Sequence, residues 1–423
     1  MDLRRAAAVP EARQGGRRTS RLDTNTSGFS WVGAEEWVRR NHWWLIALGA
    51  LVFSRYISML TGVVAAHDIH GQLWSLPHWT QNHGPRIDGG GGWFDAWDSY
   101  WYLAAAETGW PQHLNPHIPN TTGFFPALPL LLRFVHALLL GANWPLTGFV
   151  TEVLIQIPAV VGVAALARRV LDERQANLAV ILFCLFPGTY VFSQIYTEPL
   201  FILATVLCLY GLDSRNWWMA GLGAALSGAT RPTGLILMAL CAWIAAREIW
   251  RHGNWKALVA PLISPIGILA FSIYLQIHSG SYRAYMLSQQ YAWGQKFTLN
   301  AIPREFEFFF SKHKPPSNGL LTASYAWVLL VFLLWAVIGL VLLGILAHKR
   351  QMPAIWFYFC LGATVIDVVT DNVGVRARLA LLTFPLIFAY ARYLRRWYAI
   401  LPAGGLCVAG LAFLSQSIPG YIP

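Results

Sequence analysis

The chain has 423 residues, of which 56% are hydrophobic and only 12% are charged. A soluble domain carries roughly 25% charged residues, so this composition excludes an ordinary soluble protein and favours a membrane protein. The formal net charge is +11, but most basic residues flank apolar segments, where they set membrane topology. We therefore predict no nucleic-acid partner.

The N-terminal segment, residues 1–42, is basic and polar. Eight of the 31 lysines and arginines lie in it, and residues 1–30 are rich in Gly, Ser, Thr and Arg. This composition is typical of disorder, and the segment lacks the apolar core and cleavage site of a secretory signal. We predict a disordered cytoplasmic N-terminus followed by an uncleaved signal anchor.

Apolar runs near the length that crosses a bilayer, roughly 17–25 residues, recur from there to the end of the chain. They predict an all-α polytopic protein with about 11 transmembrane helices. The runs are 43–63, 148–167, 177–193, 198–212, 217–230, 233–247, 257–277, 325–347, 354–370, 379–391 and 397–415.

A further run, FFPALPLLLRFVHALLL (124–140), is short and carries prolines, an arginine and a histidine, so it either crosses or dips into the membrane. If it does not cross and the N-terminus is cytoplasmic, twelve basic residues of the short loops face the cytoplasm and three face outward. Crossing would reverse this bias, which normally favours the cytoplasm. We predict that 124–140 lies in or re-enters the outer leaflet of the cell membrane, with the long loops 64–147 and 278–324 outside.

The first outer loop contains WFDAWDSYWYLAAAETGW (93–110), with two aspartates among aromatic rings. Helix-forming residues up to Glu107 and the Gly-Trp-Pro stop predict a helix that places Asp95, Asp98 and Tyr102 on one face, beside Trp97. The two acids then serve either as catalytic carboxylates or as a capping pair that also favours the helix dipole.

Other ionisable residues lie in apolar surroundings near the predicted outer face. They are Glu198, Arg231, Asp367, Asp371, Arg376 and Arg378. Polar groups at membrane depth are costly and usually line a functional cavity. Arginines there suit a phosphate, whose oxygens accept paired hydrogen bonds from the guanidinium. Each residue alone also fits a helix cap or a local ion pair.

Metal and nucleotide sites are not indicated. Six histidines fall in the first outer loop outside the run 124–140, without a specific ligand spacing, and the five cysteines show no CxxC pair. IDGGGGW (87–93) lacks the phosphate-loop pattern. We predict no metal and no cofactor.

Five motifs taken together resemble the GT-C superfamily of polyprenyl-phosphate-sugar-dependent glycosyltransferases. The likeness is to the branch with the GPI mannosyltransferase that adds the second mannose, and its bacterial relatives. The motifs are AWDSYWYLAAAETGW (96–110), FFPALPLLLR (124–133), RVLDERQANLAVILFCLFPGTYVFSQIYTEPLF (169–201), SGATRPTGLIL (227–237) and, more weakly, RARLALLTFPLIFAYAR (376–392).

The resemblance implies a GT-C-like transmembrane module over 43–277, with membrane-surface helices in its outer loop 64–147, and C-terminal helices over 325–423. It also implies a catalytic acid in that loop, and the acid of the WD motif corresponds to Asp98, with Asp95 assisting or capping. Because the last motif reads Arg-Ala-Arg, it does not decide between Arg376 and Arg378.

The leading hypothesis is an inverting membrane glycosyltransferase that moves a hexose, with mannose expected, from a polyprenyl-phosphate carrier to an unknown acceptor hydroxyl outside. Asp98 is the expected general base, and Arg231 with Arg376 or Arg378 stabilises the leaving phosphate. Tyr102 and Tyr196 are candidates for sugar stacking, and loop 278–324, with Gln289 and Gln290, is a candidate acceptor lid.

Two alternatives remain at this point. A transporter or lipid-carrier flippase also carries intramembrane charges, but we find no repeated halves with matching broken helices, and the acids lie toward one side. The second is a metal-dependent transferase that uses a polyprenyl-diphosphate sugar. EDTA would inactivate such an enzyme.

Overall fold

The computed structural model describes residues 31–68, 98–301, 303, 307, 319–370 and 376–417. The chain divides between His42 and Trp43 into two units, and the packing described below is that of the second unit. Its described residues are helical apart from loops and one isolated bridge between Phe297 and Thr370. The all-α prediction is confirmed.

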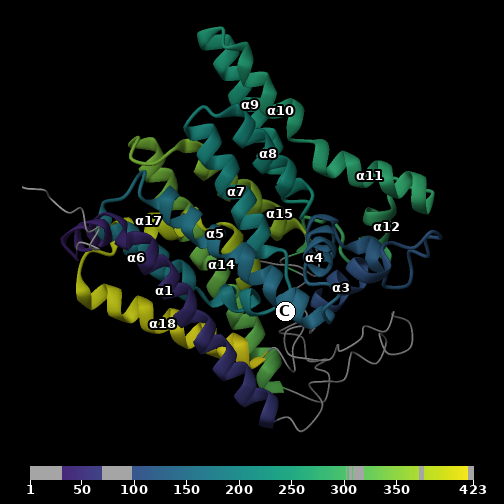
Figure 1. The fold of residues 1–423 in the computed structure, drawn as a ribbon, viewed down its shortest axis with the longest axis horizontal. Coiled ribbons are helices and arrows are strands. Elements are labelled where there is room, and N and C mark those ends of the chain that lie inside the picture. Colours follow the sequence, from purple (N-terminus) through teal and green to yellow (C-terminus); the bar gives the residue numbers. More distant parts are fainter. Residues whose placement is uncertain are drawn as a thin grey trace, which may run out of the picture. The chain divides into compact units, whose positions relative to one another are not determined.

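The N-terminal half of the helical bundle is built from helices that follow one another closely in sequence. They are α1 (Trp31–Asp68), α3 (Asp98–Thr108), η3 (Thr121–Gly123), α4 (Ala127–Leu138), α5 (Trp144–Ala167), α6 (Glu173–Leu185), η4 (Pro187–Ser193), α7 (Glu198–Asp213) and α8 (Trp217–Gly228). Figure 1 shows α7 between α5 and α8, and α3 beside α4, and these pairs are in contact.

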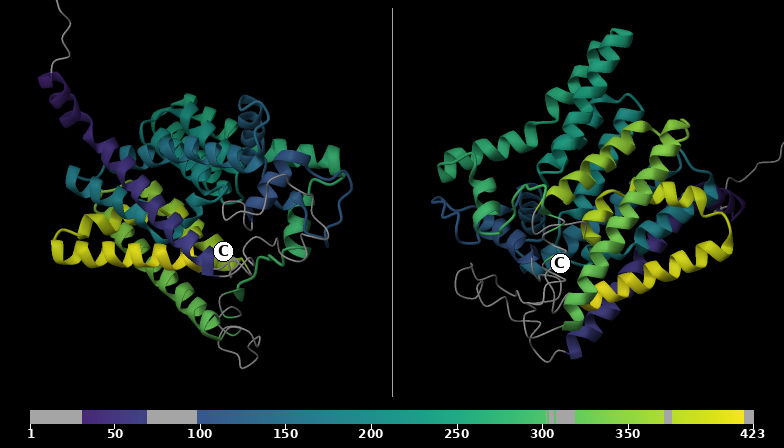
Figure 2. Two further views of the ribbon diagram at one scale, coloured as in Figure 1. Left: turned by 60° about the horizontal axis from the view of Figure 1, so that its bottom comes forward. Right: turned by 180° about the vertical axis from the view of Figure 1, so that it is seen from behind.

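The C-terminal half adds a second group of helices. They are α9 (Gly234–His252), η5 (Trp255–Leu258), α10 (Val259–Ile263), α11 (Ile266–Ser279), α12 (Ala284–Tyr291), α14 (Gly319–His348), α15 (Ala354–Val369), α16 (Ala377–Leu382), α17 (Pro385–Tyr393) and α18 (Trp397–Ser417). Helices α14, α15 and α17 pack together, and α18 packs on η4 (Figure 2).

The structure has fewer long apolar helices than the eleven predicted spans. Among the described residues, five helices are long and apolar enough to cross a membrane, or six if the bent pair α6 and η4 is one span. The predicted span 177–193 breaks before Pro187 with a 65° bend between these two helices, because a proline ring disrupts a continuing helix. Integral membrane character with several spans is confirmed, and the count of eleven is not.

Helix α4 covers the ambiguous run and has 12 residues. At 1.5 Å per residue it spans about 18 Å, short of the roughly 30 Å of a hydrocarbon core. The Arg133 guanidinium donates to the carbonyls of Ala105 and Ala106 at the end of α3, while Phe134 and Leu138 on α4 are exposed. The helix therefore anchors α3 through its arginine and presents an apolar side outward.

The core holds α7 tightly against its neighbour α8. A Cβ on Gly223 of α8 would lie 2.5 Å from the backbone nitrogen of Cys208 in α7. Small residues let helix backbones approach this closely, which is a common way to join helices in a membrane. The middle of α7 is thereby held against α8.

Candidate active site

Asp98 is the first residue of α3, and its carboxylate forms a long-range ion pair. Its Oδ2 accepts from Nη1 of Arg378 at 2.7 Å, and its backbone N–H donates to the Tyr196 hydroxyl at 3.4 Å. The Asp98 side chain is 28% exposed and that of Arg378 is 14% exposed. An acid in the first turn also favours the helix dipole, but the ion pair shows that Asp98 has a partner far along the chain.

Helix α3 is joined to the segment 194–197, which connects η4 to α7. The Ile195 N–H donates to the Ser99 hydroxyl at 3.2 Å, and a hydrogen bond of 3.1 Å joins the hydroxyls of Tyr102 and Thr197. The connection is not helical, so its amides need partners outside a helix. These bonds bring the WD motif and the YTE motif into contact.

A second ion pair lies beside the first. Arg231 Nη1 donates to Glu198 Oε1 at 2.7 Å, and the Glu198 side chain is 1% exposed. Glu198 Oε2 is buried with no hydrogen-bond partner among the described residues. Arg378 interacts electrostatically with Glu198 as well as with Asp98. The four groups therefore alternate in sign, in the order Arg231, Glu198, Arg378, Asp98.

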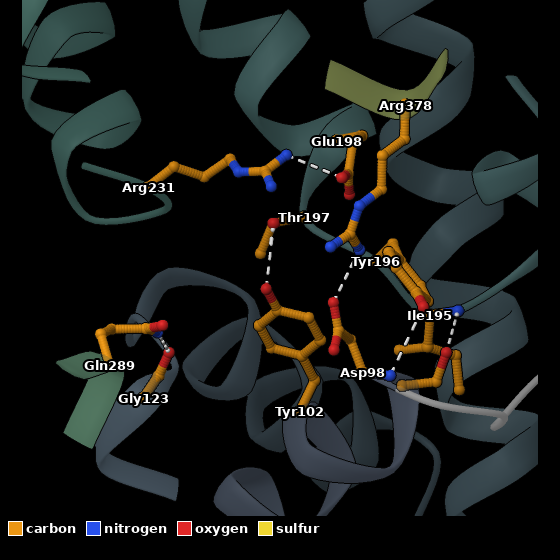
Figure 3. Close-up of polar contacts among 11 residues, drawn as sticks. Asp98, Tyr102, Gly123, Ile195, Tyr196, Thr197, Glu198, Arg231, Gln289 and Arg378 are labelled. Carbon is orange, nitrogen blue, oxygen red and sulfur yellow. Dashed lines mark hydrogen bonds and ion pairs between the residues drawn. The ribbon is translucent and has the colours of Figure 1, made fainter. Parts of the chain in front are cut away.

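Figure 3 shows the side chains of this network converging from four parts of the chain, with Arg231 opposite Asp98 and Tyr102. Asp367 of α15 is 4% exposed and interacts electrostatically with both arginines. Charges so poorly exposed are stable only when compensated, and here each arginine has an acid within hydrogen-bonding distance.

The electrostatics keep both arginines charged and the tyrosine neutral. Burial alone would lower the pKa of Arg378, but the carboxylates of Asp98 and Glu198 outweigh it and raise that pKa well above its usual value. For Arg231, too, burial would lower the pKa, but the Glu198 carboxylate outweighs it and the pKa is raised. Burial, with Asp98 contributing, raises the pKa of the Tyr102 hydroxyl, which can therefore donate a hydrogen bond at any physiological pH.

Six of the predicted site residues lie together in this network. They are Asp98, Tyr102, Tyr196, Glu198, Arg231 and Arg378. Arg378, and not Arg376, supplies the nitrogen bonded to Asp98, while Arg376 precedes α16 and is partly buried. Asp95, Trp97 and Asp371 lie outside the described residues, so their roles stay predictions.

Helix α12, in the predicted loop 278–324, packs on η3 in the predicted loop 64–147. Gln289 donates to the carbonyl of Gly123 at 2.8 Å, and the Trp293 ring contacts the rings of Trp101 and Phe124 at centroid distances of 5.6 and 5.5 Å. Figure 3 shows Gln289 and its bond to Gly123 on the side of Tyr102 that faces away from Tyr196. The predicted lid therefore sits on the FFP motif.

Within the described part of the chain, no three His, Cys, Asp or Glu side chains gather as a metal-binding group. His113 and His117 belong to that part, whereas the side chains of His67, His70, His78 and His83 lie outside it.

Glu152 of α5 was missed by the sequence reasoning. It is 4% exposed, and its Oε1 accepts from the Tyr196 backbone N–H at 3.2 Å. A lone acid within the predicted span 148–167 was the available signal, because an unpaired carboxylate there is costly.

The fold and the network define a multi-pass helical membrane protein with a paired charge cluster at the junction of α3, α7 and α16. Residues 91–252 match the family model described as Mannosyltransferase (PIG-V). This segment contains Asp98, Glu198 and Arg231, and Arg378 lies beyond it.

Curated relatives agree with the family match. The chain is similar to GPI alpha-1,6-mannosyltransferase 2 of Mus musculus, with 27% identity over 219 residues, 47% of this chain and 42% of that protein. For the Rattus norvegicus protein of that name, identity is 32% over 155 residues, 33% and 29% of the two chains. The match spans less than half of either relative. The predicted resemblance to this mannosyltransferase branch is confirmed.

Among solved structures, the chain is similar to the Archaeoglobus fulgidus oligosaccharyltransferase complexed with Zn and sulfate, with TM-score 0.48 and 13% identity over 88% of this chain and 53% of that one. The archaeal oligosaccharyltransferase AglB from the same organism, with an inhibitory peptide and a dolichol-phosphate, gives TM-score 0.45 and 14% identity over 91% and 56%.

Proposed function

We propose that this protein is an inverting mannosyltransferase that moves a hexose from a polyprenyl-phosphate carrier to an acceptor hydroxyl on the non-cytoplasmic side of the membrane. The observation that carries the proposal is the Asp98–Arg378 ion pair beside the Arg231–Glu198 pair. A partly exposed acid in a network with two arginines suits a reaction in which a proton leaves one reactant and a phosphate leaves the other. The family match over residues 91–252 supports the sugar as mannose.

Asp98 is the proposed general base. Its carboxylate takes the proton of the acceptor hydroxyl while the acceptor oxygen bonds to the anomeric carbon, and the bond from that carbon to the phosphate oxygen breaks. The leaving group is the lipid phosphate, which keeps the electron pair of the broken bond. Attack from the face opposite the phosphate inverts the anomeric centre.

Arg378 and Arg231 are the proposed phosphate-binding residues. Guanidinium groups held in place before the reaction stabilise the charge that develops on the leaving phosphate. Glu198 orients Arg231 through the 2.7 Å bond to its Oε1 and limits the net charge of the buried cluster. We retain Arg376, which lies two residues from Arg378, as a second candidate contact for the lipid phosphate.

The ion pair of Asp98 has a consequence for the reaction. While Nη1 of Arg378 is bonded to Oδ2 of Asp98, that carboxylate oxygen is occupied and is not available to the acceptor hydroxyl. A donor phosphate that takes over Arg378 Nη1 releases Asp98 toward the acceptor. Donor binding and activation of the base are coupled in this scheme, with the donor binding first.

The tyrosines contribute their hydroxyls in this proposal. Tyr102 and Tyr196 are 7% and 1% exposed, so little of either ring is available to stack on a sugar. Their hydroxyls bond to Thr197 and to the backbone of Asp98, which fixes the geometry of the base. The segment with α12 is the proposed acceptor lid, because Gln289 attaches it to the loop that precedes the FFP motif.

The test is transfer by the purified full chain in detergent, supplied with a panel of polyprenyl-phosphate hexoses and candidate acceptors. We expect release of lipid phosphate with the mannose donor and loss of at least about a hundredfold in rate for Asp98→Asn. Asp213→Asn is the matched control, because it breaks a comparable ion pair of 2.6 Å with Arg169 away from the network. Near-normal turnover by Asp98→Asn would remove the base assignment, and inactivation by EDTA would favour a metal-dependent transferase.

A further inference from the structure

Helix α5 presents three residues, spaced four apart, to the segment 192–196. A Cβ on Gly148 would lie 2.2 Å from Cδ1 of Ile195, so only a glycine leaves room for that side chain. Glu152 accepts from the backbone N–H of Tyr196 at 3.2 Å, and Gln156 donates to the carbonyl of Phe192 at 2.5 Å. Residues four apart share one face of a helix. We call Gly148, Glu152 and Gln156 the α5 face.

The α5 face is buried and polar where the surrounding helix is apolar. Glu152 and Gln156 are each 4% exposed, and Gln156 Nε2 also lies 3.4 Å from Glu152 Oε2. A buried carboxylate is expensive unless hydrogen bonds compensate it. Here its partners include the backbone amide of a non-helical connection, which itself needs an acceptor. The hydrogen bond from the Tyr196 N–H to Glu152 therefore satisfies both the buried carboxylate and the unpaired amide.

The segment held in this way leads directly into the proposed active site. Tyr196 accepts from the backbone of Asp98, Thr197 bonds to Tyr102, and Glu198 bonds to Arg231. Each of these contacts depends on where residues 196–198 lie. A small displacement of reacting groups is enough to slow an enzyme strongly.

We propose that Glu152 is a positioning residue that acts through Tyr196 to place Asp98 and Arg231, with Gly148 and Gln156 completing the support. The expected effect on the reaction rests on the proposed function. The expected effect on the position of residues 192–198 rests on the contacts alone. Glu152 itself bonds to Gln156 and to the backbone of Tyr196, and not to Asp98 or Arg231.

The first experiment measures amide hydrogen exchange in the full chain in detergent. For Glu152→Ala we expect exchange of peptides covering residues 192–198 to rise by about tenfold, because their anchoring bond is lost while the bundle stays folded. Glu152→Gln keeps an acceptor oxygen and should show a smaller rise. Thr151→Val is the control: Thr151 is fully buried on the same helix, but its hydroxyl bonds to the Thr147 carbonyl within α5.

The second experiment compares steady-state transfer by these variants. We expect Glu152→Ala to lower kcat by about tenfold or more while the donor KM changes little, with Glu152→Gln intermediate. Gly148→Ala disturbs the same segment from a different position by pushing on Ile195. Adding Ile195→Ala to Gly148→Ala removes the clashing atoms and should restore part of the lost rate, a coupling that general destabilisation does not produce.

The outcomes separate the two proposals. Unchanged exchange at 192–198 in Glu152→Ala overturns the positioning role, and so does loosened exchange with unchanged kcat. If Glu152→Ala does not fold, Glu152→Gln and the Gly148/Ile195 cycle give the answer. If the unmodified protein transfers no sugar, the proposed function fails, while the exchange experiment still decides whether the α5 face holds the segment.

Discussion

In the proposed mechanism, Asp98 and a donor phosphate compete for the guanidinium of Arg378. We expect Asp98→Asn to bind a polyprenyl phosphate about tenfold more tightly than the unmodified protein, although it transfers no sugar, because the phosphate no longer has to displace the carboxylate bonded to Nη1 of Arg378. Arg378→Gln should bind it more weakly. Displacement of a labelled polyprenyl phosphate measures both. Weaker binding by Asp98→Asn than by the Asp213→Asn control would show that Asp98 does not compete with the donor.

Single residues of the site were predictable where they broke an expected pattern. Arg231 interrupts an apolar stretch, Glu198 begins one, and Asp98 stands among aromatic rings, so the cost of a charge in such places indicated each of them. Their pairing was not predictable, because Asp98 and Arg378 are 280 residues apart. The choice of Arg378 over Arg376 required the three-dimensional position of α16.

At the scale of helices, the interface between α7 and α8 tolerates no added atom at Gly223. Gly223→Ala brings a Cβ to 2.5 Å from the Cys208 nitrogen and 2.7 Å from the Ala204 carbonyl oxygen, and backbone cannot move aside as a flexible side chain can. We expect a loss of about 1–3 kcal/mol in stability, measured as a lower melting temperature in detergent. Gly404→Ala, in α18 with nothing within 4 Å of its Cβ, should leave the melting temperature unchanged or higher. Equal effects of the two substitutions would contradict this packing.

The helices themselves were largely predictable, and their breaks were not. Apolar periodicity indicated α5, α14 and α18 because these helices are long and uninterrupted. The run 177–193 looked like one span, yet α6 ends before Pro187 and η4 turns by 65°. That bend places residues 194–197 against α3. Hydropathy is averaged over a window and does not detect such a bend. The break that leads into residues 194–197 was therefore not predicted from the sequence.

At the scale of the whole molecule, the side of the membrane on which the site operates follows from where the basic loops lie. If run 124–140 does not cross, the loop with Lys256 is cytoplasmic and the loop with Leu299 is outside. Both residues are exposed, Leu299 by 89%. We expect Leu299→Cys to react with a membrane-impermeant maleimide in intact cells, and Lys256→Cys to react only after permeabilisation. Cys407, the one native cysteine that is not buried, is replaced by serine in both variants.

The opposite labelling pattern would mean either that 124–140 crosses the membrane or that the N-terminus is not cytoplasmic. If 124–140 crossed and the other predicted spans were unchanged, Asp98 and Arg378 would lie on opposite sides of the membrane. They could lie on the same side only if one more span between them were also gained or lost. Because these two residues are bonded to each other, they fix the parity of the spans between them. The labelling result therefore tests the topology and the charged network together.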